Sequence, residues 1–400
     1  MIYGIKTCQE RRKLDNKSCP KKIFILPGGF NHLGGTLISL LGLIQGFEKC
    51  GFSEQLCILV WSDSFTEKYL RDTGYTSCIQ LIAAKNEFEF MKQALRWVGQ
   101  QPKDYPLLLD NWSNLYILLS SLRFTAIIRL SGRPIYHFCH DLTCSYNLLG
   151  ELLRKIAFAC LNPKAICNSQ FTVGHIRRLM PNIQGILYQP VDTERFNDHL
   201  NYGSPPVNLQ PILNSGARII LTPSRLNKPR IVNDKNLRSL IPVLTHLKAM
   251  GHFYHGVVIG PDESDDGSYT RELLENAAQQ GVADRFTILP ATLNIENYYK
   301  YASVVVTLAP REPFGRTVVE AIACGIPVIG SSTGGINEIL QHFASEWTVD
   351  PNNPIAVAEA IIRVVSDTNT PTLLAKGKAW VETNCNVANY AQKMMQLTGL

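Results

Sequence analysis

The sequence has no long uninterrupted hydrophobic run. Its longest apolar stretches, around residues 37–47 and 115–122, have the length of helices in a protein core and are too short to span a bilayer. The first 22 residues, MIYGIKTCQERRKLDNKSCPKK, are basic and lack the apolar centre of a secretory signal peptide. We therefore expect neither a transmembrane helix nor a cleaved leader.

The sequence also lacks paired cysteines. Its eleven cysteines are scattered, and no two of them form a Cys-x-x-Cys pair. An odd number of scattered thiols argues against a disulfide framework and against a cysteine zinc site. We expect reduced thiols and a cytoplasmic protein.

Positive charge is concentrated in the first half of the chain. Residues 1–195 carry 23 Lys and Arg against 15 Asp and Glu, whereas the rest of the chain carries 16 against 18. This surplus is compatible with an anionic ligand or with peripheral contact at the inner membrane surface, and equally with ordinary solubilising charge. No basic stretch is interleaved with aromatic residues, so nucleic acid is not an expected partner.

Length and periodicity predict two α/β domains. A chain of 400 residues with 45% hydrophobic residues can fill two cores. Short apolar runs typical of buried strands alternate with helical patterns, first from Lys21 and again from Ala217, which predicts two Rossmann-like, doubly wound parallel sheets. The expected divisions are a polar basic extension at 1–20, a first domain at 21–200, a linker at 201–216 and a second domain at 217–387.

The most informative segment is REPFGRTVVE, residues 311–320. Pro313 and Gly315 keep its first half out of a helix, and helical spacing begins near Arg316. The start of a helix offers unpaired N–H groups and a partial positive charge, which suit a phosphate. Carboxylates such as Glu312 and Glu320 accept hydrogen bonds from hydroxyls. Together these groups fit a sugar nucleotide, although Glu320 could equally complement the helix dipole and Glu312 could be a solvated loop charge.

The wider segment resembles a known signature. Glu312 and Glu320 form Glu-x7-Glu with Pro-Phe-Gly after the first Glu, followed by Ala-x-Ala-x-Gly-x-Pro-Val and Gly-Gly-x-x-Glu. This pattern resembles the donor site of retaining GT-B glycosyltransferases, in particular family GT4 (glycosyl transferases group 1). Residues 188–196, YQPVDTERF, resemble the family's PNGVDxxxF segment in a reduced form, and the similarity covers roughly residues 21–395.

The resemblance implies a GT-B architecture with two domains facing across a cleft. The first domain would bind the acceptor, and the second would bind the nucleotide sugar. A C-terminal helix at about 388–400 would pack back on the first domain.

The resemblance also implies a set of donor-binding residues: Gly34, Gly35, Arg225, Lys235, Gly260, Leu289, Glu312, Pro313, Phe314, Gly315, Arg316, Thr317, Val318 and Glu320. Among these, Arg225, Lys235 and Glu312 would act in catalysis, together with His140 at the end of the strand PIYHFCH. Asp110, Trp112 and Asp141 would line the acceptor cleft.

Several of these assignments have alternatives. The family has a Lys five or six residues after Arg225, where this chain has Arg230, so Lys235 and Arg230 compete for the role of second cation. The glycines at 34–35 fit a purely structural turn as well, and a lone His such as His140 is often structural. No Asp-x-Asp pattern occupies a site loop, and the cations are expected to replace a metal ion.

The implied reaction is metal-independent transfer of a hexosyl group, with retention, from a nucleoside diphosphate sugar to a hydroxyl acceptor. A UDP- or GDP-sugar is the expected donor, no further cofactor is expected, and the acceptor is a glycan, a lipid or a small molecule. A sugar-nucleotide epimerase would use the same donor contacts, as would a non-catalytic sugar-nucleotide binding protein. A phosphorylase fits less well, because no segment resembles the one that carries pyridoxal phosphate.

Overall fold

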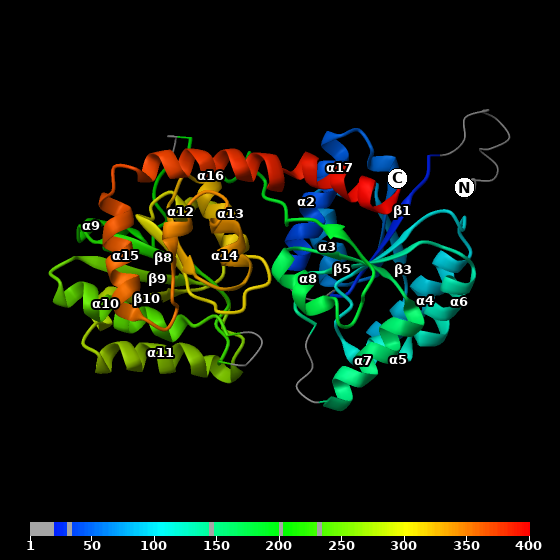
Figure 1. The fold of residues 1–400 in the computed structure, drawn as a ribbon, viewed down its shortest axis with the longest axis horizontal. Coiled ribbons are helices and arrows are strands. Elements are labelled where there is room, and N and C mark those ends of the chain that lie inside the picture. The colour runs from blue at the N-terminus through cyan, green and yellow to red at the C-terminus, as the bar shows by residue number, and fades with distance from the viewer. Residues whose placement is uncertain (1–19, 30–33, 144–147, 200–202, 230–233) are drawn as a thin grey trace.

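The computed structural model describes residues 20–29, 34–143, 148–199, 203–229 and 234–400 (Figure 1). The predicted extension at 1–20 therefore lies almost wholly outside the described residues. The chain folds into two α/β domains that lie next to each other, as Figure 1 shows. The predicted fold class of two doubly wound parallel sheets is confirmed.

The first domain is built on a seven-stranded parallel sheet of order β3-β2-β1-β4-β5-β6-β7. The strands are β1 (Ile23–Pro27), β2 (Leu56–Trp61), β3 (Ile79–Ile82), β4 (Leu107–Asp110), β5 (Ile135–Cys139), β6 (Lys164–Cys167) and β7 (Ile183–Ile186). Both faces of the sheet are buried, as the apolar strand sequences require. Along β1, Ile23 and Ile25 pack into one core layer, while Phe24 and Leu26 pack into the other.

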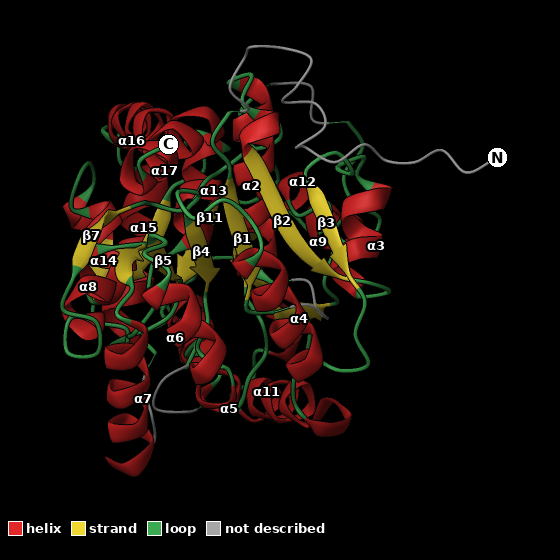
Figure 2. Ribbon diagram, turned by 90° about the vertical axis from the view of Figure 1, so that its right-hand side faces the viewer, coloured by secondary structure: helices red, strands yellow, loops and turns green. Residues whose placement is uncertain are grey.

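Helices cover both faces of this sheet (Figure 2). They are α2 (Gly35–Lys49), α3 (Phe65–Asp72), α4 (Glu87–Gly99), α5 (Leu115–Ser120), α6 (Leu122–Leu130), α7 (Leu148–Leu161) and α8 (Gln170–Ile176), with the 3-10 turn η1 (Ser53–Gln55). Residues of α2 and α3 join the core layer of Ile23, whereas residues of α4 to α8 join the layer of Phe24.

The second domain has a six-stranded parallel sheet of order β10-β9-β8-β11-β12-β13. Its strands are β8 (Arg218–Pro223), β9 (Tyr254–Ile259), β10 (Phe286–Leu289), β11 (Val304–Thr307), β12 (Val328–Ser331) and β13 (Thr348–Val349). Its helices are α9 (Gln210–Asn214), α10 (Leu240–Ala249), α11 (Ser268–Gln279), α12 (Glu296–Tyr299), α13 (Arg316–Ala323), α14 (Gly334–Leu340), α15 (Pro354–Ser366) and α16 (Thr370–Cys385), with the 3-10 turns η2 (Leu237–Ser239), η3 (Asp265–Gly267), η4 (Ala283–Arg285) and η5 (Ser345–Trp347).

Some elements differ from the sequence-based expectation. The segment 201–216, expected to be a linker, contains helix α9, and its Leu209 and Ile212 are buried in the core of the second domain. The apolar stretch at 115–122, which has the length of a single core helix, is divided between α5 and α6 at Ser121. Strands β3 and β7 were not predicted, because residues at these sheet edges are mostly only half-buried and form no strong apolar run.

The chain crosses back to the first domain at its C-terminal end. Helix α16 runs along the second domain, and α17 (Val387–Thr398) lies against α2, where Tyr390 and Met394 join the core layer of Ile23 (Figure 1). Val191, which leads into the second domain, pairs with Asn386, which leads out of it. The two crossings therefore lie side by side.

Close packing of α17 on α2 depends on a glycine. A Cβ atom on Gly46 would lie 2.1 Å from the carbonyl oxygen of Val387 and 2.8 Å from Cβ of Ala391. Any side chain at this position would push the two helices apart.

We expect Gly46→Ala to destabilise the protein by about 1–3 kcal/mol, the usual cost of overpacking. Thermal unfolding and limited proteolysis of the C-terminal helix would measure the loss. Gly174→Ala in α8 is the matched control, because a Cβ atom there meets nothing within 4 Å and alanine favours a helix by about 0.5–1 kcal/mol. Equal stability of the two variants would contradict this view of the α2–α17 contact.

Candidate functional site

A cavity of about 580 Å³ lies at the carboxyl ends of the central strands of both sheets. Strand order reverses between β1 and β4 in the first sheet and between β8 and β11 in the second. Ligands of doubly wound folds bind at such reversal points, because the loops diverge there and leave a crevice. Gly34 and Gly35 line the cavity after β1, Thr222 to Arg225 line it after β8, and Thr307 and Ala309 line it after β11.

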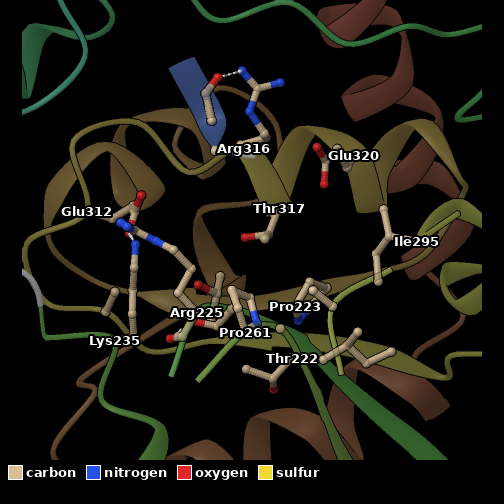
Figure 3. Close-up of a pocket in the computed structure, with 18 of the residues that line it drawn as sticks. Thr222, Pro223, Arg225, Lys235, Pro261, Ile295, Glu312, Arg316, Thr317 and Glu320 are labelled. Carbon is tan, nitrogen blue, oxygen red and sulfur yellow. Dashed lines mark hydrogen bonds and ion pairs between the residues drawn. The ribbon is translucent and has the colours of Figure 1, made fainter. Parts of the chain in front are cut away.

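The loop before α13 forms one wall of this cavity. Gly315, with φ of +108°, adopts a conformation that disfavours any other residue, and a Cβ there would also lie 3.1 Å from Ile336. Helix α13 begins directly after it. The loop is fixed further by the N–H of Gly335, which donates to the carbonyl of Glu312 at 2.8 Å. The start of α13, with Thr317 pointing into the cavity, thus faces any bound ligand (Figure 3).

Two cations and a carboxylate lie together at one end of the cavity (Figure 3). Nζ of Lys235 is 2.5 Å from Oε2 of Glu312, and both side chains are about four-fifths buried. Arg225 lies at the same end and is more exposed, with Nη1 3.1 Å from Oε1 of Glu263. Cationic groups beside a helix N-terminus form an environment that suits phosphate oxygens.

Glu320 lies at the opposite end of the cavity (Figure 3). Its side chain is buried, and Oη of Tyr299 donates to its Oε2 at 2.9 Å. Burial raises the pKa of this carboxyl above its ordinary value, although the nearby Arg316 acts in the opposite direction. A buried carboxylate that faces a cavity is a strong acceptor for hydroxyl groups of a ligand.

Arg316 points away from the cavity centre toward α2 (Figure 3). Its guanidinium donates to the carbonyl oxygen of Pro190 at 3.0 Å, to Oγ of Ser39 at 2.6 Å and to Oε1 of Gln189 at 3.1 Å. Burial lowers the pKa of the guanidinium, and the charge of Glu320 partly offsets this effect. Arg316 thus joins the start of α13 to the first domain.

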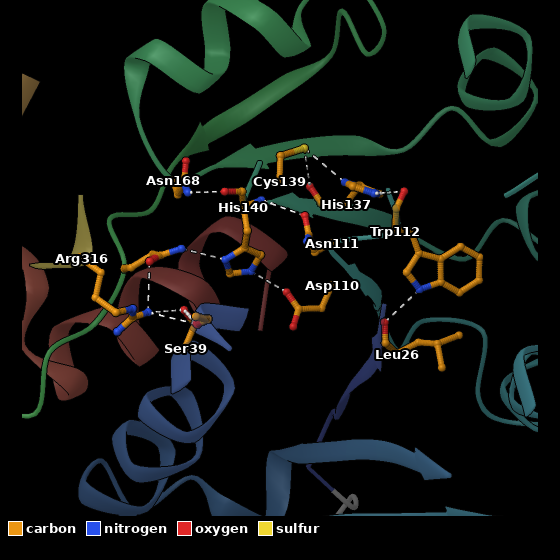
Figure 4. Close-up of polar contacts among 12 residues, drawn as sticks. Leu26, Ser39, Asp110, Asn111, Trp112, His137, Cys139, His140, Asn168 and Arg316 are labelled. Carbon is orange, nitrogen blue, oxygen red and sulfur yellow. Dashed lines mark hydrogen bonds and ion pairs between the residues drawn. The ribbon is translucent and has the colours of Figure 1, made fainter. Parts of the chain in front are cut away.

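His140 belongs to the same hydrogen-bond network (Figure 4). Its Nε2 lies 2.7 Å from Oδ1 of Asp110, and its Nδ1 lies 3.0 Å from Nε2 of Gln189, which also contacts Arg316. The main-chain oxygen of His140 accepts from Asn168 at 3.0 Å. The ring is therefore held on both nitrogens in the interior of the first domain.

The structure brings together most of the predicted donor-binding residues. The predicted residues that line the cavity are Gly34, Gly35, Arg225, Lys235, Gly260, Glu312, Arg316, Thr317 and Glu320. Arg230, the competitor of Lys235, lies outside the described residues.

Other predicted residues are not among the described residues that line the cavity. Phe314 and Val318 are packed in the core of the second domain, Leu289 is buried at its strand end, and Pro313 and Gly315 shape the loop without lining the cavity. Pro313 instead offers its carbonyl oxygen to Oγ of Ser169 in the first domain at 2.5 Å.

Four residues predicted for the first domain are not among the described residues that line the cavity. His140 was expected beside the reacting group and Asp110 in the acceptor cleft; the structure shows the two buried and paired with each other. Trp112 is a core residue whose Nε1 donates to the carbonyl oxygen of Leu26 at 3.1 Å (Figure 4). Asp141 accepts from the N–H and hydroxyl of Thr143, both at 2.8 Å, and so fixes its own turn. The sequence places these residues at strand ends but does not tell which way they point.

The prediction missed a group of lining residues that, apart from Glu263, are small or apolar. They are Thr222, Pro223, Ser224, Ile259, Pro261, Glu263, Ala291, Thr292, Ile295, Thr307 and Ala309. All of them end or follow strands of the second sheet. Their position directly after apolar strand runs is the sequence feature from which they could have been predicted. Among the described residues, no three His, Cys, Asp or Glu side chains are grouped so that they could hold a metal ion.

Parts of this chain are similar to known proteins in sequence. Residues 217–383 match the family described as "Glycosyl transferases group 1". D-inositol 3-phosphate glycosyltransferase of Salinispora tropica is 32% identical over 123 residues, which are 30% of this chain and 26% of the relative. N-acetyl-alpha-D-glucosaminyl L-malate synthase of Bacillus anthracis is 28% identical over 26% of this chain and 27% of the relative. The matched part thus spans about a quarter of the length of these two relatives.

Solved structures resemble the whole chain. Alr3699/HepE of Anabaena in complex with UDP has a TM-score of 0.76 at 17% identity, over 95% of this chain and all of that one. Sucrose-phosphate synthase of Thermosynechococcus elongatus has a TM-score of 0.66 at 19% identity, over 94% and 98% of the two chains. These likenesses identify the architecture as GT-B. The match at residues 217–383 to the group 1 glycosyltransferases includes both Glu312 and Glu320 of the cavity.

Proposed function

We propose that this chain is a retaining hexosyltransferase. It would move a hexosyl group from a nucleoside diphosphate sugar to a hydroxyl group of a glycan, a lipid or a small molecule. The observation that carries the proposal is the cavity between the two sheets, which has Lys235, Arg225 and the start of α13 at one end and buried Glu320 at the other. UDP is the first nucleotide to test, because Alr3699/HepE of Anabaena was solved with UDP and with UDP-glucose.

The proposed donor lies along the cavity. Its ribose hydroxyls donate to Glu320, and its base lies near Gly260, Ala291 and Thr292 at the ends of β9 and β10. The diphosphate is bound near Arg225, Lys235 and the turn of Gly34 and Gly35. Glu312, oriented by Lys235 at 2.5 Å, accepts from hydroxyls of the hexose.

In the proposed reaction, the bond between the anomeric carbon and the diphosphate oxygen breaks as the acceptor oxygen bonds to the same face of that carbon. The acceptor proton passes to the departing phosphate oxygen, so the charges balance. Negative charge grows on the diphosphate, and Arg225 and Lys235 stabilise it in the transition state. These two cations take the role that a metal ion has in metal-dependent transferases.

His140 acts in this proposal as a positioning residue. It holds Gln189, which in turn contacts Arg316 at the start of α13. Asp110 fixes the ring from the other side at 2.7 Å. Through this chain of contacts, His140 and Asp110 fix the position of Arg316, and so of the start of α13, relative to the first domain.

The donor class can be tested by thermal shift with UDP, GDP, ADP and their sugars. We expect UDP and a UDP-hexose to raise the melting temperature, because a ligand that binds only the folded protein stabilises it. EDTA should leave this shift unchanged. NMR of the anomeric proton in donor and product should show the same configuration.

Release of an isomerised sugar nucleotide in the absence of an acceptor would indicate an epimerase instead. Binding with no turnover of any kind would indicate a binding protein. An inverted anomeric configuration in the product would overturn retention.

Replacing the buried carboxylate of Glu320 is expected to change thermal stability and nucleotide affinity in opposite directions. The raised pKa of Glu320 means that the folded protein holds its proton more tightly than the unfolded chain, so stability falls as pH rises from the ordinary value of 4.5 through the raised pKa. Without nucleotide, we expect Glu320→Gln to melt above the wild type at neutral pH, with the difference vanishing below pH 4.5. Its UDP affinity should fall about 30-fold, for a lost charged hydrogen bond of about 2 kcal/mol.

Glu275→Gln on the exposed surface of α11 is the control for this experiment and should change neither quantity. A Glu320→Gln variant that melts below the wild type at every pH and binds UDP normally would contradict the proposed role of Glu320.

Lys235 should act mainly on turnover. We expect Lys235→Met to lower kcat about 100-fold or more, the usual loss when one stabilising group is removed, with a smaller change in KM. Lys228→Met is the control, because Lys228 is exposed and is not among the residues that line the cavity. Arg230→Met compares the competing cation directly. A large loss of kcat in Arg230→Met with normal kcat in Lys235→Met would reverse the assignment.

A further inference from the structure

The first domain carries an apolar surface that no part of the described chain covers. Its exposed large side chains include Leu148, Leu149 and Leu152 of α7 and Ile127 and Leu130 of α6. Leu148 is 91% exposed and Leu130 is 86% exposed. Helices α5, α6 and α7 lie together at one end of the domain, and the N-terminal end of α7 projects beyond them in both views (Figures 1 and 2).

The apolar surface of α7 is a continuous stripe. Leu148, Leu152 and Ile156 are spaced four residues apart and so lie on one face of the helix, with Leu149 beside them. The opposite face, with Ala157, Phe158 and Leu161, is buried against the domain. A surface helix normally presents polar residues to water, and a helix that is apolar on both faces is usually covered on both.

Positive charge predominates on the segment that contains α6 and α7. Between residues 111 and 164 the sequence contains six Lys and Arg, of which Arg133 is buried, and only Asp141 and Glu151 as acids. Glu151 is paired with Arg178 at 3.2 Å, and Asp141 is bonded to Thr143. Lys155, Arg123 and Arg129 are exposed on the same helices, and Arg129 also donates to the carbonyl oxygens of Ala159 and Cys160 at the end of α7. Helices α6 and α7 therefore present exposed leucines and isoleucines together with exposed Lys and Arg.

We propose that this face of α6 and α7 docks on an anionic lipid bilayer. An exposed apolar stripe bordered by Lys and Arg is the pattern of helices that lie in the membrane interface, where the apolar residues enter the acyl boundary and the cations meet phosphate headgroups. A second copy of this chain, bound through the same face, would bring two sets of like charges together. The proposal concerns a surface separate from the cavity and does not depend on the proposed transferase activity.

Flotation with lipid vesicles tests the proposal on the full chain without nucleotide. We expect the wild type to float with vesicles of phosphatidylcholine and phosphatidylglycerol, and much less with phosphatidylcholine alone. High salt should weaken the binding. Leu148→Glu combined with Leu152→Glu should reduce binding about tenfold or more, since two large apolar side chains are lost from the bilayer.

Two further double variants test whether binding depends on the basic residues and on this face of the protein. Arg123→Glu with Lys155→Glu should reduce binding to the anionic vesicles by at least about fivefold for each residue, while leaving the leucines in place. Val207→Glu with Ile355→Glu is the matched control, because both residues are exposed apolar positions of the second domain. This control should bind as the wild type does.

Several outcomes would overturn the proposal: no flotation of the wild type, equal flotation with neutral vesicles, or equal loss in the control variant. Size-exclusion chromatography tests whether the face instead joins two copies of the chain. A wild-type dimer that the Leu148→Glu, Leu152→Glu variant converts to a monomer, without flotation of either, would show that the face joins two copies of the chain.

Discussion

The contact on which the site depends is made by the guanidinium of Arg316. It extends from the first turn of α13 in the second domain and donates to Pro190, Gln189 and Ser39. Burial of a charged group is costly unless its donors are satisfied, so these acceptors hold the start of α13 against the first domain. The N–H groups at that start, and Thr317 beside it, owe their place in the cavity to this contact. The hydrogen bonds from Ser169 to Pro313 and from the N–H groups of Gln170 and Phe171 to Glu338 add further contacts between the domains.

The charged groups of the cavity that suit ligand binding lower the stability of the folded protein. Glu320 is buried and bears a raised pKa, so its ionised form costs stability in the folded protein. Lys235 and Glu312 form a partly buried pair at the other end of the cavity. Neither arrangement is the most stable choice for a protein core. Polar groups that a core would avoid are gathered where a charged ligand can bind, and the apolar interior around Phe314 and Val318 supports them from behind.

The parts of the fold that the sequence predicted are those set by local chemistry. The two doubly wound sheets were expected from the alternation of apolar strand runs with helical patterns, and the loop and helix around α13 follow from the positions of Pro313 and Gly315. Edge strands such as β7 were missed because most of their residues are only half-buried and form no strong apolar run. In the site, Lys235 was predicted as a second cation although the family's spacing after Arg225 falls on Arg230; the structure places Lys235 at the cavity, and Arg230 lies outside the described residues. The orientation of His140 and Trp112 depends on neighbours distant in the sequence, such as Asp110 and Leu26, which no local pattern reveals.

The paired crossings at Val191 and Asn386 determine how the domains can move. Within the described residues, the chain passes from one core to the other only between Leu187 and Val191 and between Cys385 and Tyr390. Because these two segments are adjacent, and the N–H of Val191 donates to the carbonyl of Cys385 at 2.8 Å, they form a double-stranded hinge. Rotation of the domains about these two connecting segments would separate Arg316 from α2 and open the crevice, while both hydrophobic cores stay intact. Entry of a large substrate would then break a few polar contacts and leave the packing of each domain unchanged.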